Sequence, residues 1–115
     1  MRVIIAGSRH FHDYVVLQEA IRQSGFVITS VVSGCAPGVD SLGELYALEN
    51  NLSVDRHPAK WDLFGKAAGP IRNKEMAQCA DALIALRAPG SRGTENMIQQ
   101  ATAMGLKVFV WEIVL

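Results

Sequence analysis

The sequence has few cysteines, no net charge and no long hydrophobic run, and each absence narrows the range of functions. Cys35 and Cys79 are far apart, without metal-ligand spacing, so we expect no metal and no other cofactor. Lys plus Arg equals Asp plus Glu at 11 each, so there is no broad basic field and a nucleic-acid partner is not expected. No apolar run approaches the roughly 18–20 residues of a membrane helix. Met1 and Arg2 lead into a strand rather than a signal peptide, so we expect a cytoplasmic protein without a membrane partner.

The 115 residues, half of them hydrophobic, are enough for one domain with a core and too few for two. Apolar runs typical of strands alternate with segments of helical spacing. This alternation predicts a parallel sheet with right-handed crossovers and helices on both faces. We therefore expect residues 1–115 to form a single α/β, Rossmann-like, three-layer domain with about five parallel strands. The expected strands cover about 2–6 (the central one), 28–33, 52–58, 81–86 and 108–114, and the expected helices cover about 13–24, 41–49, 70 onward and a last segment ending at Gly105.

One expected strand runs into a loop in which two glycines bracket an arginine, Gly90-Ser91-Arg92-Gly93-Thr94. Glycine allows positive φ and a close approach of the backbone to a ligand, and the first turn of the next helix presents unpaired N–H groups. An anion fits such a place. Thr94 can cap the helix, and Arg92 can add a bidentate charged contact. The alternative is a strand-to-helix turn that needs glycine only for its geometry.

Two other expected strands end in similar loops, Gly7-Ser8-Arg9 and Ser33-Gly34-Cys35-Ala36-Pro37-Gly38-Val39-Asp40. Because the carboxyl ends of parallel strands share one edge of a sheet, the three loops predict one crevice. Asp40 is either a helix-start residue or a carboxylate aimed at a ribose or a base. Ser41 and Glu44 have the spacing of a capping box. Cys35 sits at a helix start, which lowers a thiol pKa, but without a placed partner we expect a small residue rather than a nucleophile.

The connection over residues 59–70 is too long for a bare link in so small a domain. Trp61 within it either stacks on a base or, as we favour, packs the connection onto the core. Gly69-Pro70 predicts a helix start, which places Arg72 and Asn73 in the first turn. A cation there opposes the helix dipole, so an anionic ligand explains Arg72 better than stability does.

These loops, together with Ala59-Lys60-Trp61 and Gly69-Pro70-Ile71-Arg72-Asn73, resemble the small YspA-related, cpYpsA-like family of the SLOG superfamily over nearly the whole chain. The resemblance implies a Rossmann-like fold and a pocket for nucleotide-derived ligands. The superfamily includes the Lonely Guy phosphoribohydrolases, the DNA-processing protein DprA and sensor domains for ADP-ribose-like signals. The resemblance also implies a homodimer or a higher homo-oligomer.

The phosphoribohydrolases of the superfamily share a Pro-Gly-Gly-x-Gly-Thr-x-x-Glu stretch, which this chain keeps in part. The position of that glutamate holds Met97, and Glu95 lies two residues earlier, about 200° away around a helix. Cleavage of an N-glycosidic bond needs a carboxylate near the ribose. The remaining catalytic candidates are Asp40, Glu44 and Glu95, so the comparison favours phosphate binding over catalysis.

We therefore expect binding of a nucleotide, ADP-ribose or cyclic-nucleotide-type signal, by a sensor or a sequestering protein with little or no enzymatic turnover. The alternative is an N-glycosidic hydrolase of nucleoside monophosphates. A third possibility is a module that binds single-stranded DNA. A local basic patch of Arg9, Arg72 and Arg92 would favour such binding, but the zero net charge disfavours it. The expected ligand-binding residues are Gly7, Ser8, Arg9, Ser33, Gly34, Cys35, Gly38, Asp40, Trp61, Arg72, Asn73, Gly90, Ser91, Arg92, Gly93 and Thr94.

Overall fold

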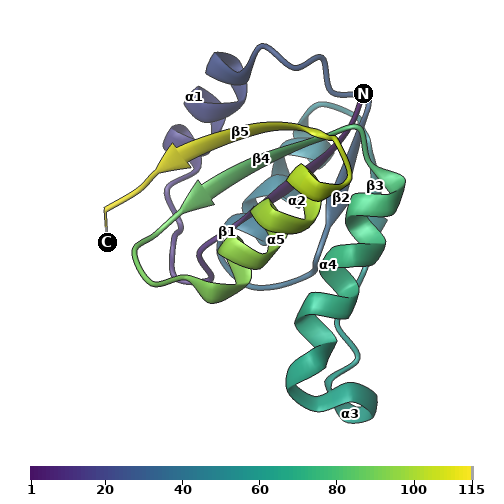
Figure 1. Cartoon of the computed structure of the whole chain (residues 1–115). Helices are drawn as coiled ribbons and strands as arrows, with labels where there is room; N and C mark the ends of the chain where they lie inside the picture. The colour runs from purple at the N-terminus through teal and green to yellow at the C-terminus, as the bar shows by residue number, and fades with distance from the viewer. Residues whose placement is uncertain (115) are drawn as a thin grey trace.

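A computed structural model describes residues 1–114 and shows a five-stranded parallel sheet with helices on both faces (Figure 1). The strand order is β3-β2-β1-β4-β5, so β1 is the central strand, as predicted. The predicted single-domain, Rossmann-like α/β fold is confirmed. The elements in chain order are β1 (Arg2–Gly7), α1 (Tyr14–Ser24), β2 (Ser30–Ser33), α2 (Val39–Glu49), β3 (Ser53–Arg56), α3 (Trp61–Phe64), the 3₁₀ turn η1 (Gly65–Ala67), α4 (Ala68–Cys79), β4 (Ala82–Arg87), α5 (Arg92–Ala103) and β5 (Lys107–Glu112).

The core forms two layers because successive side chains of β1 point to opposite faces of the sheet. Val3 and Ile5 pack in the layer that contains residues of α1 and α2. Ile4 and Ala6 pack in the other layer, with residues of α4 and α5. All four side chains are buried, which explains why this strand reads as a continuous apolar run rather than an alternating one.

Helix α1 has the ends that the sequence predicts. The Asp13 side chain accepts a hydrogen bond from the Val16 backbone N–H at 3.2 Å, as an N-cap residue does. At the other end, Gly25 adopts a left-handed φ of 70°, and its N–H donates to the Arg22 carbonyl.

The connection over residues 59–70 differs from the prediction. It is largely helical, with α3 and η1 leading directly into α4, which begins at Ala68. Arg72 is therefore the fifth residue of α4 and lies outside its first turn. The expectation that Arg72 opposes the dipole at the helix start was wrong, because the helix begins before Gly69 and Pro70.

The start of α2 also differs from the prediction. The helix begins at Val39, so Ser41 lies inside the first turn, where its hydroxyl donates to the Ala36 carbonyl at 3.0 Å. Glu44 accepts a hydrogen bond from Ser33 instead of reaching back to the helix start. The predicted capping box is wrong, because Gly38 occupies the cap position without a side-chain hydrogen bond.

Gly38 holds the start of α2 against the chain that leaves β1. Its φ is 78°, and a Cβ added there would lie 2.3 Å from the Ser8 carbonyl oxygen. The N–H of Val39 donates to that same Ser8 carbonyl at 3.1 Å. A residue with a side chain is therefore excluded at position 38 by both conformation and space.

Candidate functional site

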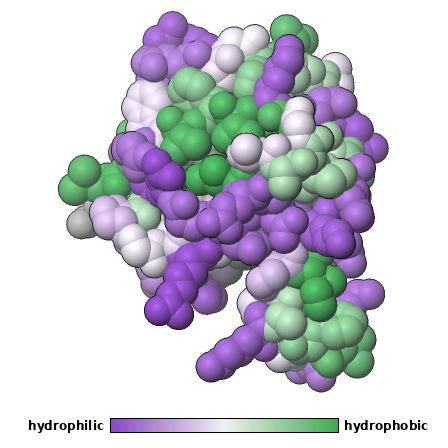
Figure 2. All heavy atoms as spheres, in the orientation of Figure 1, coloured by the Kyte–Doolittle hydropathy of each residue, from purple (hydrophilic) through white to green (hydrophobic). Residues whose placement is uncertain are grey.

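A cleft of about 610 Å³ opens at the carboxyl ends of the central strands, where the three glycine-containing loops meet. Its walls come from the residues after β1, the loop between β2 and α2, the segment around α3 and α4, and the start of α5. This is the crevice beyond the strand ends that open parallel sheets provide. Figure 2 shows the α3 end of the molecule projecting from the body with hydrophobic surface on it, and α3 contributes Trp61 to the cleft wall.

The start of α5 forms one wall of the cleft. The helix begins at Arg92, so Gly93 and Thr94 are helical and Ser91 is the N-cap residue. The predicted cap at Thr94 is wrong by three positions, because its hydroxyl lies inside the first turn, 2.8 Å from the Ser91 hydroxyl. Apart from its chain neighbours and the backbone of its own helix, a Cβ added at Gly93 would meet no atom of residues 1–114 within 4 Å. The first turn of α5 therefore faces open space with two hydroxyl groups beside it.

The loop after β2 forms the opposite wall and is held from α4. One terminal nitrogen of the Arg72 guanidinium donates to the Gly34 carbonyl at 2.5 Å, and its Nε donates to Asn73 at 2.9 Å. A Cβ added at Gly34 would lie 2.7 Å from that Arg72 nitrogen and 2.8 Å from an Asp40 carboxylate oxygen. Arg72 thus lines the cleft and also fixes the loop, so its cation has a protein partner.

Asp40 is a buried carboxyl group in the same wall. Its side chain accepts a hydrogen bond from the Ala36 N–H at 3.2 Å, and 5% of the residue is exposed. Burial raises the pKa of Asp40 to about 6, although the Ala36 hydrogen bond and the nearby Arg72 charge oppose that rise. Near neutral pH the cleft therefore contains a carboxyl group that changes charge easily.

Asn73 joins the two helices that flank the cleft. Its side-chain amide donates to the Gly93 carbonyl at 3.3 Å and to the Asn96 side chain at 3.0 Å. Because Asn73 is 4% exposed, it is positioned from α4 to hold the first turn of α5. Both Arg72 and Asn73 lie at the cleft, as expected, and both also support its walls.

The structure brings together all but two of the residues predicted to bind a ligand. Ser33 is buried behind the cleft, where its hydroxyl donates to Glu44 at 2.7 Å and accepts from the Cys35 N–H at 3.1 Å. Gly38 is pressed against the chain after β1 and lies outside the lining. These two residues shape the loop and are not part of the cleft surface.

Of the three carboxylates considered for catalysis, only Asp40 lines the cleft. Glu44 pairs with Arg56 at 2.9 Å, and Glu95 pairs with Arg87 at 2.8 Å. Both glutamates are therefore occupied by arginines outside the lining. Met97 lies in the cleft wall and is 1% exposed.

The cleft has two exposed cations, Arg9 and Arg92. Within residues 1–114, neither forms an ion pair with an acidic side chain. Trp61 is 58% exposed and lies over Gly69, where an added Cβ would be 3.3 Å from its ring. Trp61 therefore both packs on α4 and presents ring surface to the cleft.

Cys35 is exposed in the loop, with a positive φ of 64°. The surrounding protein partly desolvates its sulfur and raises the pKa of the thiol, so the lowering expected at a helix start is wrong. A raised pKa is consistent with the prediction that Cys35 is not a nucleophile.

A model of the YspA, cpYpsA-related SLOG family matches residues 1–64, which include the loops after β1 and β2. The Gene 61 protein of Mycobacterium phage D29 is 32% identical over 117 residues, and the match covers 93% of each chain. The chain belongs to the YspA, cpYpsA-related SLOG family. The resemblance carried by the sequence motifs is thereby confirmed.

The fold of this SLOG chain also matches a solved structure of DNA processing protein A (DprA) from Streptococcus pneumoniae, with a TM-score of 0.77 and 20% identity. The match covers 95% of this chain and 49% of DprA, so the chain spans about half of that protein's length. At this identity the likeness shows the fold. Because the neighbour is named for DNA processing, the expectation that nucleic acid is not a partner gains no support.

Within residues 1–114, no helix combines the length and apolar character needed to cross a membrane.

Sequence reasoning missed three notable cleft residues in this SLOG chain, Pro58, Ala59 and Met76. Pro58 and Ala59 line the cleft shortly after the end of β3. They could have been predicted, because the carboxyl ends of all the parallel strands lie at the same edge of the sheet. Met76 and Met97, of which the sequence had singled out only Met97 as the replacement of a glutamate, are each 1% exposed while also contributing to the lining. Their double role has no signature in the helical pattern, because a cleft floor and a core use the same side chains.

Proposed function

We propose that the cleft binds a nucleotide-derived ligand, with a phosphate group at the first turn of α5. The observation that carries this proposal is the open backbone at Gly93, beside the hydroxyls of Ser91 and Thr94 and the cation of Arg92, which pairs with no acidic side chain of residues 1–114. Helix starts of this kind bind phosphate through backbone N–H groups and the helix dipole. Arginine adds bidentate contacts to phosphate oxygens.

The rest of the cleft suits the remainder of such a ligand. Its volume of about 610 Å³ lies within the roughly 300–1,000 Å³ of small-molecule sites. Trp61 presents ring surface for a base, and Asp40 lies in the opposite wall, where a carboxyl group can bond a ribose hydroxyl. Membership of the SLOG family supports a nucleotide-related role.

The ligand is bound without efficient turnover, by a sensor or a protein that sequesters a nucleotide signal. Two of the three carboxylates that N-glycosidic cleavage could use are paired with arginines outside the cleft. Met97 lies in the cleft wall at the position where phosphoribohydrolases have a glutamate. Phosphate contacts that are equal in the ground and transition states give affinity without rate.

A second candidate, a hydrolase of nucleoside monophosphates, is favoured by one observation. The pKa of Asp40 is raised to about 6, close to that of a general acid working near neutral pH. In that case Asp40 would protonate the leaving base. Release of free base at an ordinary enzymatic rate, on the order of 10 per second, would select this function over binding alone.

Cytoplasmic action as a homo-oligomer belongs to the same proposal. Cys35 and Cys79 are both free thiols, in keeping with a reducing compartment. Leu63 and Phe64 on the projecting α3 end are 73% and 46% exposed, which suits a contact with a second copy.

The test is binding of AMP, ADP, ADP-ribose, cyclic AMP and a short single-stranded DNA, followed by mass spectrometry of bound and released species. We expect Gly93→Val to weaken nucleotide binding about ten- to a hundredfold, the equivalent of the roughly 1.5–3 kcal/mol of charge-assisted hydrogen bonds. The Cβ of a valine there would point into open space, so we expect the fold to persist. Gln99→Val, on an exposed position of the same helix, is the matched control. Equal affinity in the folded Gly93→Val protein would refute the phosphate site, and a preference for DNA would replace the ligand class.

A further inference from the structure

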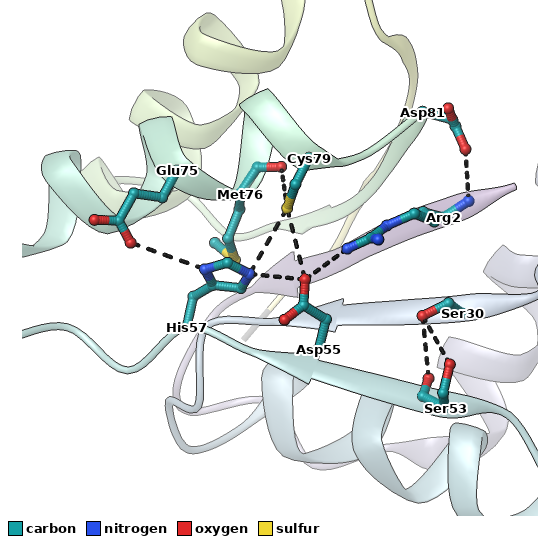
Figure 3. Close-up of polar contacts among 9 residues, drawn as sticks. All are labelled: Arg2, Ser30, Ser53, Asp55, His57, Glu75, Met76, Cys79 and Asp81. Atoms are coloured by element: carbon teal, nitrogen blue, oxygen red, sulfur yellow. Dashed lines mark hydrogen bonds and ion pairs between the residues drawn. The ribbon is translucent and has the colours of Figure 1, made fainter.

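Three side chains with metal-ligating atoms lie together between β3 and the end of α4 (Figure 3). Asp55 belongs to β3, His57 directly follows that strand, and Cys79 ends α4. The Cys79 sulfur is 3.7 Å from His57 Nε2 and 3.7 Å from Asp55 Oδ2, and these last two atoms are 3.0 Å apart. The residues are half-buried, so the group is held by the protein and is still reachable by an ion.

The separations of these three atoms match those around a tetrahedral zinc ion. Zinc binds thiolate sulfur at about 2.3 Å and nitrogen or oxygen at about 2.0–2.2 Å, which places neighbouring ligand atoms roughly 3.3–3.6 Å apart. The observed separations bracket this range, so shifts of a few tenths of an ångström would admit the ion. One sulfur, one imidazole nitrogen and one carboxylate oxygen form a donor set that zinc prefers over Mg²⁺ or Ca²⁺.

The groups around the three ligands are those that support a metal site. Glu75 has a carboxylate oxygen 3.8 Å from His57 Nδ1, the side of the ring turned away from the cluster. This separation is longer than a hydrogen bond, but a negative charge on that side favours the tautomer with the proton on Nδ1, which leaves the Nε2 lone pair for a metal. Arg2 donates at 2.6 Å to Asp55 Oδ2, the same oxygen that faces His57 and Cys79, and so fixes the position of this carboxylate. The charges balance, because a thiolate and a carboxylate offset the dication while Arg2 and Glu75 offset each other.

The arrangement does not suit a catalytic thiol. In a nucleophile–base–carboxylate triad, the nucleophile and the carboxylate bond different nitrogens of the histidine. Here Glu75 does face Nδ1, but Nε2 lies closer to Asp55 Oδ2, at 3.0 Å, than to the Cys79 sulfur, at 3.7 Å. The nitrogen that would serve as the base for the thiol therefore already faces a carboxylate, and Cys79 and Asp55 lie around it as ligands of one ion would. Sequence reasoning dismissed a metal because the two cysteines lack ligand spacing, but this group uses one cysteine and depends on packing between β3 and α4.

We propose that Asp55, His57 and Cys79 form a zinc site with a fourth position open to water. Zinc binding would release the thiol proton to solvent and leave the imidazole proton on Nδ1, facing Glu75. The bound ion would tie the edge strand β3 to α4, the helix that carries Arg72 and Asn73. The site stands on observations separate from those that support the nucleotide cleft.

The test is titration of the purified, metal-free protein with Co²⁺ and then Zn²⁺. We expect one Co²⁺ per chain, the visible absorption of tetrahedral cobalt and the near-ultraviolet charge transfer of a thiolate ligand, all abolished by Zn²⁺. Cys79→Ser should remove the charge-transfer band, and His57→Gln should weaken Zn²⁺ binding by at least the roughly 10–100-fold that loss of an outer partner costs. Glu75→Gln, in a positioning residue, should weaken it within that range. Cys35→Ser and His12→Gln are matched controls that should bind Zn²⁺ like the native chain.

Circular dichroism of each metal-free variant checks that it is folded, and Glu75→Gln keeps the test valid if a ligand variant is not, since Glu75 is exposed. The absence of a thiolate-to-cobalt band in the native protein would overturn the proposal. Native-like Zn²⁺ affinity in both folded Cys79→Ser and folded His57→Gln would do the same.

Discussion

Asp40 is a buried carboxyl group whose ionisation its surroundings oppose. Its pKa is raised from the ordinary 3.8 to about 6, chiefly by burial. Between those pH values the folded protein holds a proton that the unfolded chain has released. Stability therefore falls as pH rises from about 4 to 6, by up to about 3 kcal/mol from this group, and the loss persists above pH 6.

We predict that Asp40→Asn removes this loss. The amide is neutral at every pH and can still accept the hydrogen bond from the Ala36 N–H. The free energy of unfolding at pH 7 should rise by about 1–3 kcal/mol, while the value at pH 4 stays near that of the native chain. Urea unfolding at pH 4, 5, 6 and 7 measures the difference. Parallel curves for the two proteins across this range would show that Asp40 does not titrate there.

The sequence predicted the place of a residue at the cleft correctly, and for the right reason, only where that place depends on neighbouring residues in the chain. Gly90, Ser91, Arg92 and Gly93 follow a strand and begin a helix, so their place at the cleft was readable from the sequence. Arg72 was placed at the cleft for a wrong reason. Its partner is the Gly34 carbonyl, 38 residues away, and no local pattern encodes such a contact.

Helix α2 packs on β1 at Gly43, where no larger residue fits without displacement. A Cβ added at Gly43 would lie 2.9 Å from the Ile5 Cβ and Cγ2 atoms. Both residues are buried, so the helix approaches the central strand closely at this point. This contact helps to hold α2, and the loop before it, at the edge of the cleft.

We predict that Gly43→Ala lowers the free energy of unfolding by about 1–2 kcal/mol. Overpacking costs roughly 1–3 kcal/mol, and alanine returns about 0.5–1 kcal/mol through its better helix propensity. Gly93→Ala is the matched control, since its Cβ meets open space and should raise stability by about 0.5–1 kcal/mol. Denaturant unfolding of the three proteins measures both effects. An increase in stability from Gly43→Ala would mean that α2 can move away from Ile5 without loss.

Elements with strong local patterns were predicted well, and short ones were not. Helix α1 has helical periodicity and clear end signals, strand β1 is a continuous apolar run that ends in a glycine loop, and both were found where expected. Helix α3 was missed because its four residues, Trp61 to Phe64, show no buried face; all of them are exposed. A single turn of helix is not stable alone, so its existence depends on the chain around it.

The whole chain illustrates how a shared sheet edge gathers distant segments. The loops after β1, β2 and β4 are far apart in sequence, yet the order β3-β2-β1-β4-β5 brings them to one cleft. That arrangement was predictable because the carboxyl ends of parallel strands lie on one side of the sheet.

The cluster of Asp55, His57 and Cys79 could not be predicted from the sequence, because its formation depends on which helix covers the edge strand. A net charge of zero likewise describes the chain and not the cleft, where Arg9 and Arg92 are unpaired within residues 1–114.

The most direct test of a phosphate site at the start of α5 is amide chemical-shift mapping during titration with AMP and ADP-ribose. We expect the largest shifts at Arg92, Gly93 and Thr94, smaller shifts at Gly34 across the cleft, and none along α1 on the opposite face. The shifts should disappear in Gly93→Val and persist in Gln99→Val. An unchanged spectrum with both nucleotides, or shifts concentrated on α1, would contradict the proposed cleft.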